Sequence, residues 1–226
     1  MSKVKVTDEI WQVGGGPLTE PEDAAIYLIN FDGHAALVDA GCGFANDRLL
    51  ANVRACNIMP EQIELLLITH CHFDHTGGAA ALQKLLSCKT VAHQLDAEFL
   101  EIGDNAATAA TWYGASISPF VVDYKISLPS ETIALGARTI TALHTPGHSP
   151  GSVVYLTDSQ GLKILFGQDV HGPLDASFHS NRRDYENSLR LLLTLDADVL
   201  CEGHYGIYRG KREVQEFISQ FLGRRG

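Results

Sequence analysis

Short apolar runs that end in polar or glycine-containing turns recur along the chain, and each predicts a buried strand followed by a loop. The runs of the first half are Ile10–Val13, Ala25–Phe31, His34–Val38, Leu65–Ile68 and Cys88–Ala92. Those of the second half are Thr139–His144, Val153–Leu156, Leu162–Phe166 and Ala197–Leu200. Asp32-Gly33 joins the second and third runs, and this dipeptide between apolar segments is a strong signal for a hairpin.

Segments with helical composition or spacing alternate with these strands. They are Asn46–Ala55, a turn opened by Pro60, Ala79–Leu86, Gln94–Thr111, Asp184–Leu195 and Lys211–Phe221. In 184–195 the leucines form one apolar stripe, which indicates packing on a core. Strands and helices interleave without a linker or a repeat. We therefore expect a single α/β domain over residues 1–226, with its strand ends converging on one edge.

The densest group of reactive side chains follows the run Leu65–Ile68. Three imidazoles and one carboxylate fall within six residues, at His70, His72, Asp74 and His75. Helix formers come next, so the group lies on a strand-to-helix loop. Imidazole nitrogens and carboxylate oxygens are ligands that zinc and similar divalent cations prefer, and the sequence predicts a metal site here. Cys71 lies inside the group, but an extended backbone turns its side chain away from its neighbours, so we expect it not to be a ligand.

The same event, a strand followed by a turn and then a His or Asp, recurs later in the chain. His148 lies in Thr145–Ser152, where two prolines and two glycines fix the backbone. Asp169 follows the run Leu162–Phe166, and His204 follows Cys201-Glu202-Gly203. Asp39 also stands at a strand end, where it has either a functional role or the role of a helix cap.

The composition of the chain limits the classes of molecule that could bind the protein and the compartment in which it could act. The formal charge of −10 over 226 residues argues against nucleic acid, which needs a basic surface. The five cysteines are odd in number and contain no Cys-x-x-Cys pair, which fits a reducing compartment. The stretch that begins Met1-Ser2-Lys3-Val4 lacks the long apolar core typical of a signal peptide, and no segment reaches the ~20 apolar residues that span a bilayer. We expect a cytoplasmic protein that acts on a small-molecule substrate, with no membrane partner; a homodimer is left open.

The ordered set of candidate ligands resembles the metallo-β-lactamase superfamily. The residues that carry the resemblance are His70-x-His72-x-Asp74-His75, His148 in a Thr-Pro-Gly-His turn, Asp169 and His204. The resemblance implies a four-layer αββα sandwich, in which two mixed β-sheets are flanked by helices and a dinuclear site lies at one edge. It also implies two divalent metal ions, of which zinc is expected and iron or manganese are alternatives.

The resemblance further implies a role for each ligand. The first metal would be held by His70, His72 and His148, and the second by Asp74, His75 and His204. Asp169 would bridge the two metals. Asp39 matches the strand-end aspartate of the family, which supports the ligand loop from behind. True β-lactamases of this fold carry Cys or Ser where this chain has Asp169. The carboxylate therefore points to the glyoxalase II, lactonase, thioesterase and phosphodiesterase branches.

These observations favour a dinuclear metal-dependent hydrolase in which a metal-bridging hydroxide attacks an ester, thioester or lactone, in the manner of glyoxalase II. Asp74 and Asp169 would be its catalytic carboxylates, with Asp74 orienting the nucleophile. A phosphodiesterase or phosphatase on the same two-metal site is the first alternative. A mononuclear iron enzyme resembling the persulfide dioxygenases is the second, and the presence of His75 and His204 counts against it.

Three further side chains are candidates for substrate binding. Trp112 and Tyr113 lie in the long segment between the first ligand loop and the His148 turn, where aromatic rings could line a substrate wall or pack in the core. His171 follows Asp169 closely and could bind substrate or protonate a leaving group, or it could be an ordinary surface histidine.

His93 ends the run Cys88–Ala92 without ligand-type neighbours, so we expect it to be structural.

Overall fold

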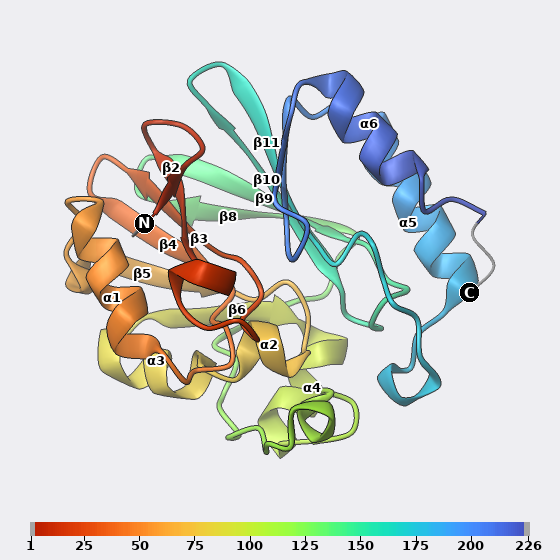
Figure 1. Cartoon of the computed structure of the whole chain (residues 1–226), viewed down its shortest axis with the longest axis horizontal. Helices are drawn as coiled ribbons and strands as arrows, with labels where there is room; N and C mark the ends of the chain where they lie inside the picture. Colours follow the sequence, from red (N-terminus) through yellow and green to blue (C-terminus); the bar gives the residue numbers. More distant parts are fainter. Residues whose placement is uncertain (1–2, 224–226) are drawn as a thin grey trace.

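A computed structural model describes residues 3–223, and their strands form two mixed sheets that lie face to face (Figure 1). Sheet A has seven strands in the order β1-β2-β3-β4-β5-β6-β7, and sheet B has six in the order β13-β12-β11-β10-β9-β8. The strands of sheet A are β1 (Val4–Lys5), β2 (Ile10–Gly14), β3 (Ile26–Phe31), β4 (His34–Val38), β5 (Ile63–Leu67), β6 (Lys89–His93) and β7 (Tyr124–Ile126). Those of sheet B are β8 (Ser130–Leu135), β9 (Arg138–His144), β10 (Val153–Ser159), β11 (Leu162–Gln168), β12 (Val199–Glu202) and β13 (Ile207–Arg209).

The helices cover the outer faces of both sheets (Figure 1). Sheet A carries α1 (Asn46–Ala55), α3 (Ala79–Leu86) and α4 (Gln94–Ile102), and sheet B carries α5 (Arg182–Thr194) and α6 (Lys211–Ser219). Shorter turns are α2 (Phe73–Thr76), η1 (Gly16–Leu18), η2 (Pro60–Gln62), η3 (Ala110–Tyr113) and η4 (Ala176–Phe178). The predicted four-layer αββα sandwich is confirmed. None of the helices among residues 3–223 has the length and apolar character needed to cross a membrane.

The alternation of side chains along each strand produces three separate apolar cores. Between the sheets, large buried residues such as Phe31, Tyr155 and Phe166 interdigitate. The opposite faces of the strands meet the helices, with Leu82 of α3 under sheet A and Leu189 of α5 under sheet B. The predicted leucine stripe of α5 is therefore core.

Two expectations about local structure are wrong in detail. The segment Gln94–Thr111 is helical only as far as Ile102, because Gly103 adopts a φ of +73° and ends α4. Residues 103–109 form turns instead. The strand predicted at Ala197–Leu200 is β12, which spans Val199–Glu202, and it is not the last strand, because β13 follows it. The predicted hairpin is present, with both Asp32 and Gly33 at positive φ between β3 and β4.

The topology brings the strand ends that carry polar residues to one side of the sandwich. β4, β5 and β6 are parallel neighbours, so their carboxyl ends lie at one edge of sheet A. In sheet B, β9 and β11 are both antiparallel to β10, and β12 is parallel to β11, so these three also end together.

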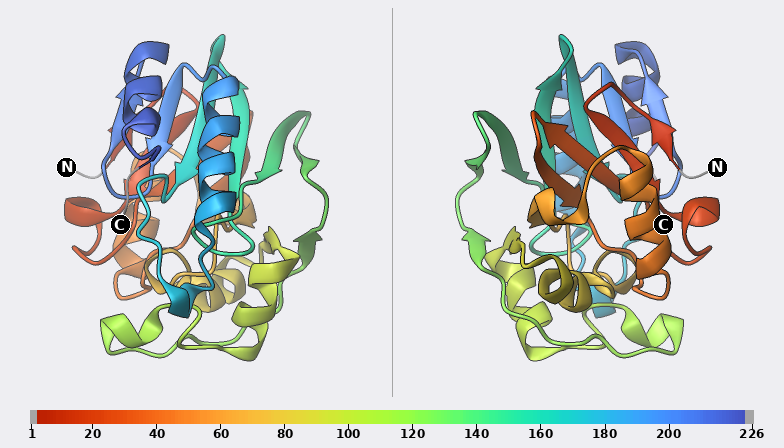
Figure 2. Two further views of the ribbon diagram at one scale, coloured as in Figure 1. Left: turned by 90° about the vertical axis from the view of Figure 1, so that its right-hand side faces the viewer. Right: turned by 90° about the vertical axis from the view of Figure 1, so that its left-hand side faces the viewer.

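Hydrogen bonds between the two sheets fix the position of one edge relative to the other. The Tyr155 hydroxyl of β10 donates to the Ile68 carbonyl at 2.8 Å, and the Tyr27 hydroxyl of β3 donates to the Glu202 carbonyl at 2.8 Å. The loops that extend from both edges face each other on the lower side of the molecule in the views of Figures 1 and 2, where residues 103–122 and 169–180 also lie.

Candidate metal centre

The first ligand loop leaves β5 and turns at once into α2, so that its polar side chains point inward. His70, His72, Asp74 and His75 are all buried. The Thr76 hydroxyl closes the loop by donating to the carbonyls of Cys71 and His72, at 3.0 and 2.9 Å. The sequence places ligand-type residues on both sides of this turn, which is why one short loop supplies four of them.

Asp39 supports this loop from behind. Its carboxylate accepts hydrogen bonds from the Thr69 amide and hydroxyl, at 2.8 and 2.7 Å, and lies 2.7 Å from His75 Nδ1. α1 begins at Asn46 after Ala45, so Asp39 does not cap that helix. A carboxylate on Nδ1 leaves His75 Nε2 as the nitrogen that faces the centre.

The candidate ligands form two adjoining groups. In each group the ligand atoms lie within 4.8 Å of one another. The first group combines residues of the loop after β5, of the turn after β9 and of the segment after β11: His70, His72, His148 and Asp169. The second group is Asp74, His75 and His204. All seven residues that the sequence singled out are therefore brought together.

Asp169 lies where the two groups meet. One of its carboxylate oxygens is 3.3 Å from His148 Nε2, on the side of the first group. The other oxygen is 3.1 Å from His75 Nε2 and 3.3 Å from His204 Nε2, on the side of the second. Asp74 completes the second group, 3.1 Å from His204 Nε2.

The residues present fit divalent cations. The Nε2 atoms of His70, His72, His75 and His148 are buried and make no hydrogen bond of good geometry. Buried polar nitrogens of this kind are nearly always satisfied in proteins, and cations bound at the two groups would satisfy all four. The five imidazoles and two carboxylates of the two groups are a donor set suited to zinc, iron or manganese.

Electrostatics separate the histidines into two kinds. Burial, together with the neighbouring imidazoles, holds the pKa of His70 and His72 well below the usual value, so both are neutral and ready to ligate. Burial also acts to lower the pKa of His75 and His204. For these two, however, Asp169 and the other nearby carboxylates prevail, raising the pKa of His75 well above its usual value and that of His204 to about 10.

A cavity of about 140 Å³ opens onto both groups. It is lined by His72, Asp74, Ala109, Trp112, Tyr113, His148, Asp169, His171, Pro173, Phe178 and His204. Trp112 is 59% exposed and Tyr113 36% exposed, so both border the cavity and neither is a core residue. Phe178 of η4, which sequence patterns did not single out, is buried between His72 and Trp112, with ring centroids at 4.2 and 4.6 Å.

Two further polar side chains border the cavity. Tyr113 lines it together with Asp74, and burial together with the Asp74 carboxylate raises the pKa of Tyr113. His171 Nδ1 lies 2.8 Å from Glu202, a fully buried carboxylate that also accepts from the amides of His204 and Tyr205. Glu202 precedes the Gly203-His204 turn, a position that carries no sequence signal of its own.

The remaining candidates lie away from the ligands. The Cys71 side chain points into the core of sheet A, with Sγ 3.6 Å from the Ala107 carbonyl. His93 stacks on His144 at a centroid distance of 3.8 Å, and burial lowers its pKa to about 4. Both placements agree with the expectation that neither residue is a ligand.

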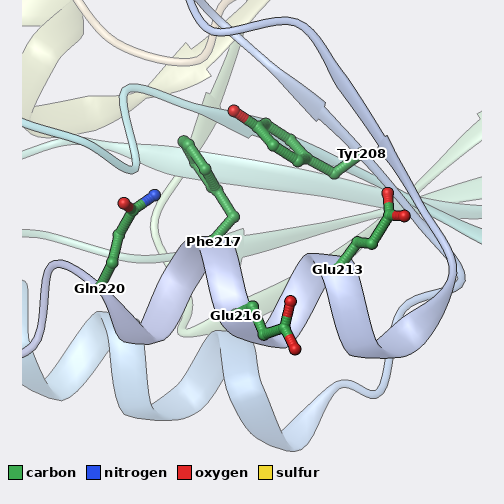
Figure 3. A pocket seen from close by; sticks show the side chains of 5 residues that line it. All are labelled: Tyr208, Glu213, Glu216, Phe217 and Gln220. Carbon is green, nitrogen blue, oxygen red and sulfur yellow. The ribbon is translucent and has the colours of Figure 1, made fainter.

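A larger hollow, of about 330 Å³, lies on the outer side of sheet B between β13 and α6 (Figure 3). Tyr208 stacks on Phe217 there at 4.1 Å. Its lining residues, Tyr208, Glu213, Glu216, Phe217 and Gln220, include no histidine and none of the candidate ligands. Size alone therefore does not locate the reactive site.

This fold and this arrangement of ligands define a class of metallo-hydrolase, and comparison with known proteins identifies the family. The profile of the Metallo-beta-lactamase superfamily matches residues 19–204. The chain belongs to this superfamily. The predictions of the superfamily and of a metal-dependent hydrolase within it are confirmed.

The individual proteins that resemble this chain have low sequence identity to it. The chain is 28% identical to the acyl-coenzyme A thioesterase MBLAC2 of Gallus gallus over 90% of this chain and 79% of that protein. It is 27% identical to the hydroxyacylglutathione hydrolase GloC of Haemophilus influenzae, over 85% and 89% respectively. The structure resembles the subclass B3 metallo-β-lactamase BJP-1 of Bradyrhizobium japonicum with a TM-score of 0.77 and 22% identity, covering 98% of this chain and 90% of that one. That likeness shows the fold alone.

Proposed function

We propose that this chain is a dinuclear metal-dependent hydrolase of thioesters. The observation that carries the proposal is the meeting of two groups of ligand atoms at Asp169, on the floor of a cavity with an aromatic wall. His70, His72 and His148 would hold one cation, and Asp74, His75 and His204 the other. Asp169 lies within reach of both, which suits it to bridge them.

The side chains of this chain have distinct tasks in such a reaction. Two divalent cations held by these residues would supply Lewis-acid chemistry, lowering the pKa of water and polarising a carbonyl. Asp39 orients His75, and the Pro173 carbonyl orients His148 by accepting from its Nδ1 at 2.7 Å. Asp74 and Tyr113 both line the cavity; Asp74 would act as a ligand that orients the nucleophile, and the Tyr113 hydroxyl is placed to donate to the reacting carbonyl.

The aromatic wall supports a thioester with an apolar acyl group. Trp112 and Phe178 offer ring surface beside the imidazoles of the first group, and apolar walls with a few polar groups are typical of small-molecule sites. Two relatives carry names that point the same way: MBLAC2 is named an acyl-coenzyme A thioesterase and GloC a hydroxyacylglutathione hydrolase. A thioester also needs no strong general acid, because a thiolate leaves readily.

Metal analysis and a substrate panel test the proposal. We expect two zinc ions per chain by elemental analysis after reconstitution, with iron or manganese as replacements. A panel of an acyl thioester, a lactone and a phosphodiester should show thioester hydrolysis fastest. One ion or none per chain would contradict the dinuclear centre, and preferential cleavage of the phosphodiester would contradict the substrate class.

Hydrolysis also predicts independence from oxygen. We expect the rate of thioester cleavage to be the same in air and under strictly anaerobic conditions, because water is the only co-substrate. The measurement is thiol release from the same zinc-loaded preparation in both atmospheres. A strict requirement for dioxygen would refute the hydrolase and favour an iron oxidoreductase on the same ligands.

A further inference from the structure

One buried carboxylate that belongs to neither ligand group forms hydrogen bonds with two loops. These are the loops that supply the histidines of the first ligand group. Asp96 stands in the first turn of α4 and is completely buried. One of its oxygens accepts from the Cys71 amide at 2.8 Å and from the Ser149 hydroxyl at 2.6 Å. The other oxygen accepts from the Gly151 amide at 2.6 Å.

The positions of these donors give the contact its meaning. Cys71 lies between the ligands His70 and His72, and Ser149 follows the ligand His148 directly. The two loops come from different sheets and from distant parts of the sequence. We propose that Asp96 is a positioning residue that sets the distance between these loops and thereby the cation affinity of the first ligand group, formed by His70, His72, His148 and Asp169.

The surroundings of Asp96 are built for this contact. A Cβ on Gly151 would lie 2.5 Å from the Asp96 amide nitrogen and 2.6 Å from its carboxylate, so only glycine allows the approach. Ser152 fixes the other partner, since its hydroxyl accepts from the Ser149 amide at 3.1 Å and lies 2.8 Å from the Ser149 hydroxyl. Burial raises the pKa of Asp96, and the hydrogen bonds from Ser149, Gly151 and Cys71 act in the opposite direction, as does the positive end of the α4 dipole.

The second group is held by a different carboxylate. Asp39 contacts Thr69 and His75, and the hydrogen bonds of Asp96 within the described chain run to Cys71, Ser149 and Gly151. The Thr69 hydroxyl that donates to Asp39 also lies 3.2 Å from His70 Nδ1, so Asp39 is linked to both groups, whereas Asp96 is linked to the loops of the first group. Removing groups that orient metal ligands costs about 10–100-fold in metal affinity, so loss of Asp96 should affect the first cation more than the second.

The test titrates the metal-free full chain with Co²⁺, whose absorption spectrum reports each site, and with Zn²⁺ against a competing chelator. In Asp96→Asn an amide NH2 group replaces one of the two carboxylate oxygens. Both oxygens accept hydrogen bonds, so the NH2 group must face an N–H or O–H donor and that hydrogen bond is lost. We expect one of the two cations to bind about 10–100-fold more weakly while the other is unchanged. Asp39→Asn should weaken mainly the cation held through His75, so the larger spectral change should fall at the other site than in Asp96→Asn.

Two further variants keep the result interpretable. Asp198→Asn alters a carboxylate just before β12 that accepts from the Lys163 amide and lies 4.0 Å from Lys211 Nζ, and it should leave both affinities unchanged. Ser149→Ala removes one of the three donors to Asp96 and should give a smaller loss at the same cation, even if Asp96→Asn folds poorly. Equal weakening of both cations in Ser149→Ala and Asp96→Asn, or no change in either variant, would overturn the proposal.

The inference rests on the two-cation centre proposed above, but the two can fail separately. Two cations bound by the wild-type chain with unchanged affinity in Asp96→Asn would overturn the role of Asp96 alone. Selective loss of one cation in Asp96→Asn, in a chain that cleaves no thioester, would uphold Asp96 and overturn the substrate assignment. A wild-type chain that binds only one cation, or none, would overturn both.

Discussion

Several histidines of the centre are held through the ring nitrogen that faces away from it. His75 Nδ1 meets Asp39, His148 Nδ1 donates to the Pro173 carbonyl, and His70 Nδ1 lies 3.2 Å from the Thr69 hydroxyl. In each case Nε2 is left toward the centre. A ring fixed at one nitrogen loses little freedom when the other binds a cation, so the arrangement is preorganised for metal.

At the same scale, Trp112 should contribute to substrate binding and little to stability. It is 59% exposed, so Trp112→Ala opens no core cavity and should leave the melting temperature near normal. We expect KM for a long-chain acyl thioester to rise about tenfold, which corresponds to ~1.4 kcal/mol of lost apolar contact. Steady-state kinetics with long and short acyl groups, together with thermal unfolding, measure both effects.

Trp11→Ala is the matched control for this change, because Trp11 packs against the core under sheet A. It should lower the melting temperature and leave KM unchanged. If Trp112→Ala instead lowers the melting temperature strongly while the folded fraction keeps normal kinetics, the ring belongs to the core and the proposed wall is wrong.

At the level of elements, the His148 turn is seated on the start of α5. The Asn181 amide donates to the Gly147 carbonyl at 2.8 Å, and the Ser188 hydroxyl donates to the Pro146 carbonyl at 2.7 Å. Gly147 has a φ of +135°, and a Cβ there would lie 2.1 Å from the Tyr185 amide nitrogen. The turn and the helix therefore approach as closely as two backbones allow.

Gly147→Ala should separate the turn from α5 and displace His148. We expect a loss of ~3 kcal/mol or more in the free energy of unfolding and lower zinc content in the folded fraction. The control is Gly161→Ala in the β10–β11 turn, where φ is +77° but no atom lies within 4 Å of the added Cβ. That change should cost only about 1 kcal/mol, with normal zinc content. Equal effects in denaturant unfolding would contradict the close contact.

Among the strands and loops, local sequence patterns predicted some elements and missed others. Strands with continuous apolar runs, such as β5 and β11, and the loops that follow them were predictable from local pattern. β7 and β13 were not, because each is three residues long and has at most one buried residue, so neither has an apolar run. Asp96, Phe178 and Glu202 could not be assigned, since their roles depend on contacts with loops far away in the chain.

At the scale of the whole molecule, the candidate ligands belong to both halves of the sandwich. His70 to His75 follow a strand of sheet A, whereas His148, Asp169 and His204 follow strands of sheet B. Cations bound among them would cross-link the two sheets. Because the unfolded chain does not hold these groups together, metal binding should stabilise the folded state by mass action.

This coupling makes the stabilisation by zinc depend on pH. In the metal-free chain Asp169 and Asp74 raise the pKa of His204 to about 10, so the imidazole is protonated at neutral pH. The stability from this protonation is fully present below the unfolded pKa of ~6.5 and is lost as pH rises through about 10. Zinc must displace the same proton, so its affinity should increase over that range.

We therefore expect the difference in melting temperature between the zinc-loaded and the metal-free chain to widen as pH rises from about 6.5 to 8.5. Two opposing slopes produce this result: the metal-free chain loses support from protonated His204, while zinc binds more tightly. Thermal unfolding at fixed free zinc, set by a chelator buffer, measures the difference. His204→Gln removes one of the two histidines of the second ligand set whose pKa is raised, and it should reduce the slope; the remaining slope comes from His75. A difference that stays constant with pH in the wild-type chain, or a slope as steep in His204→Gln as in the wild-type chain, would show that zinc does not compete with the His204 proton.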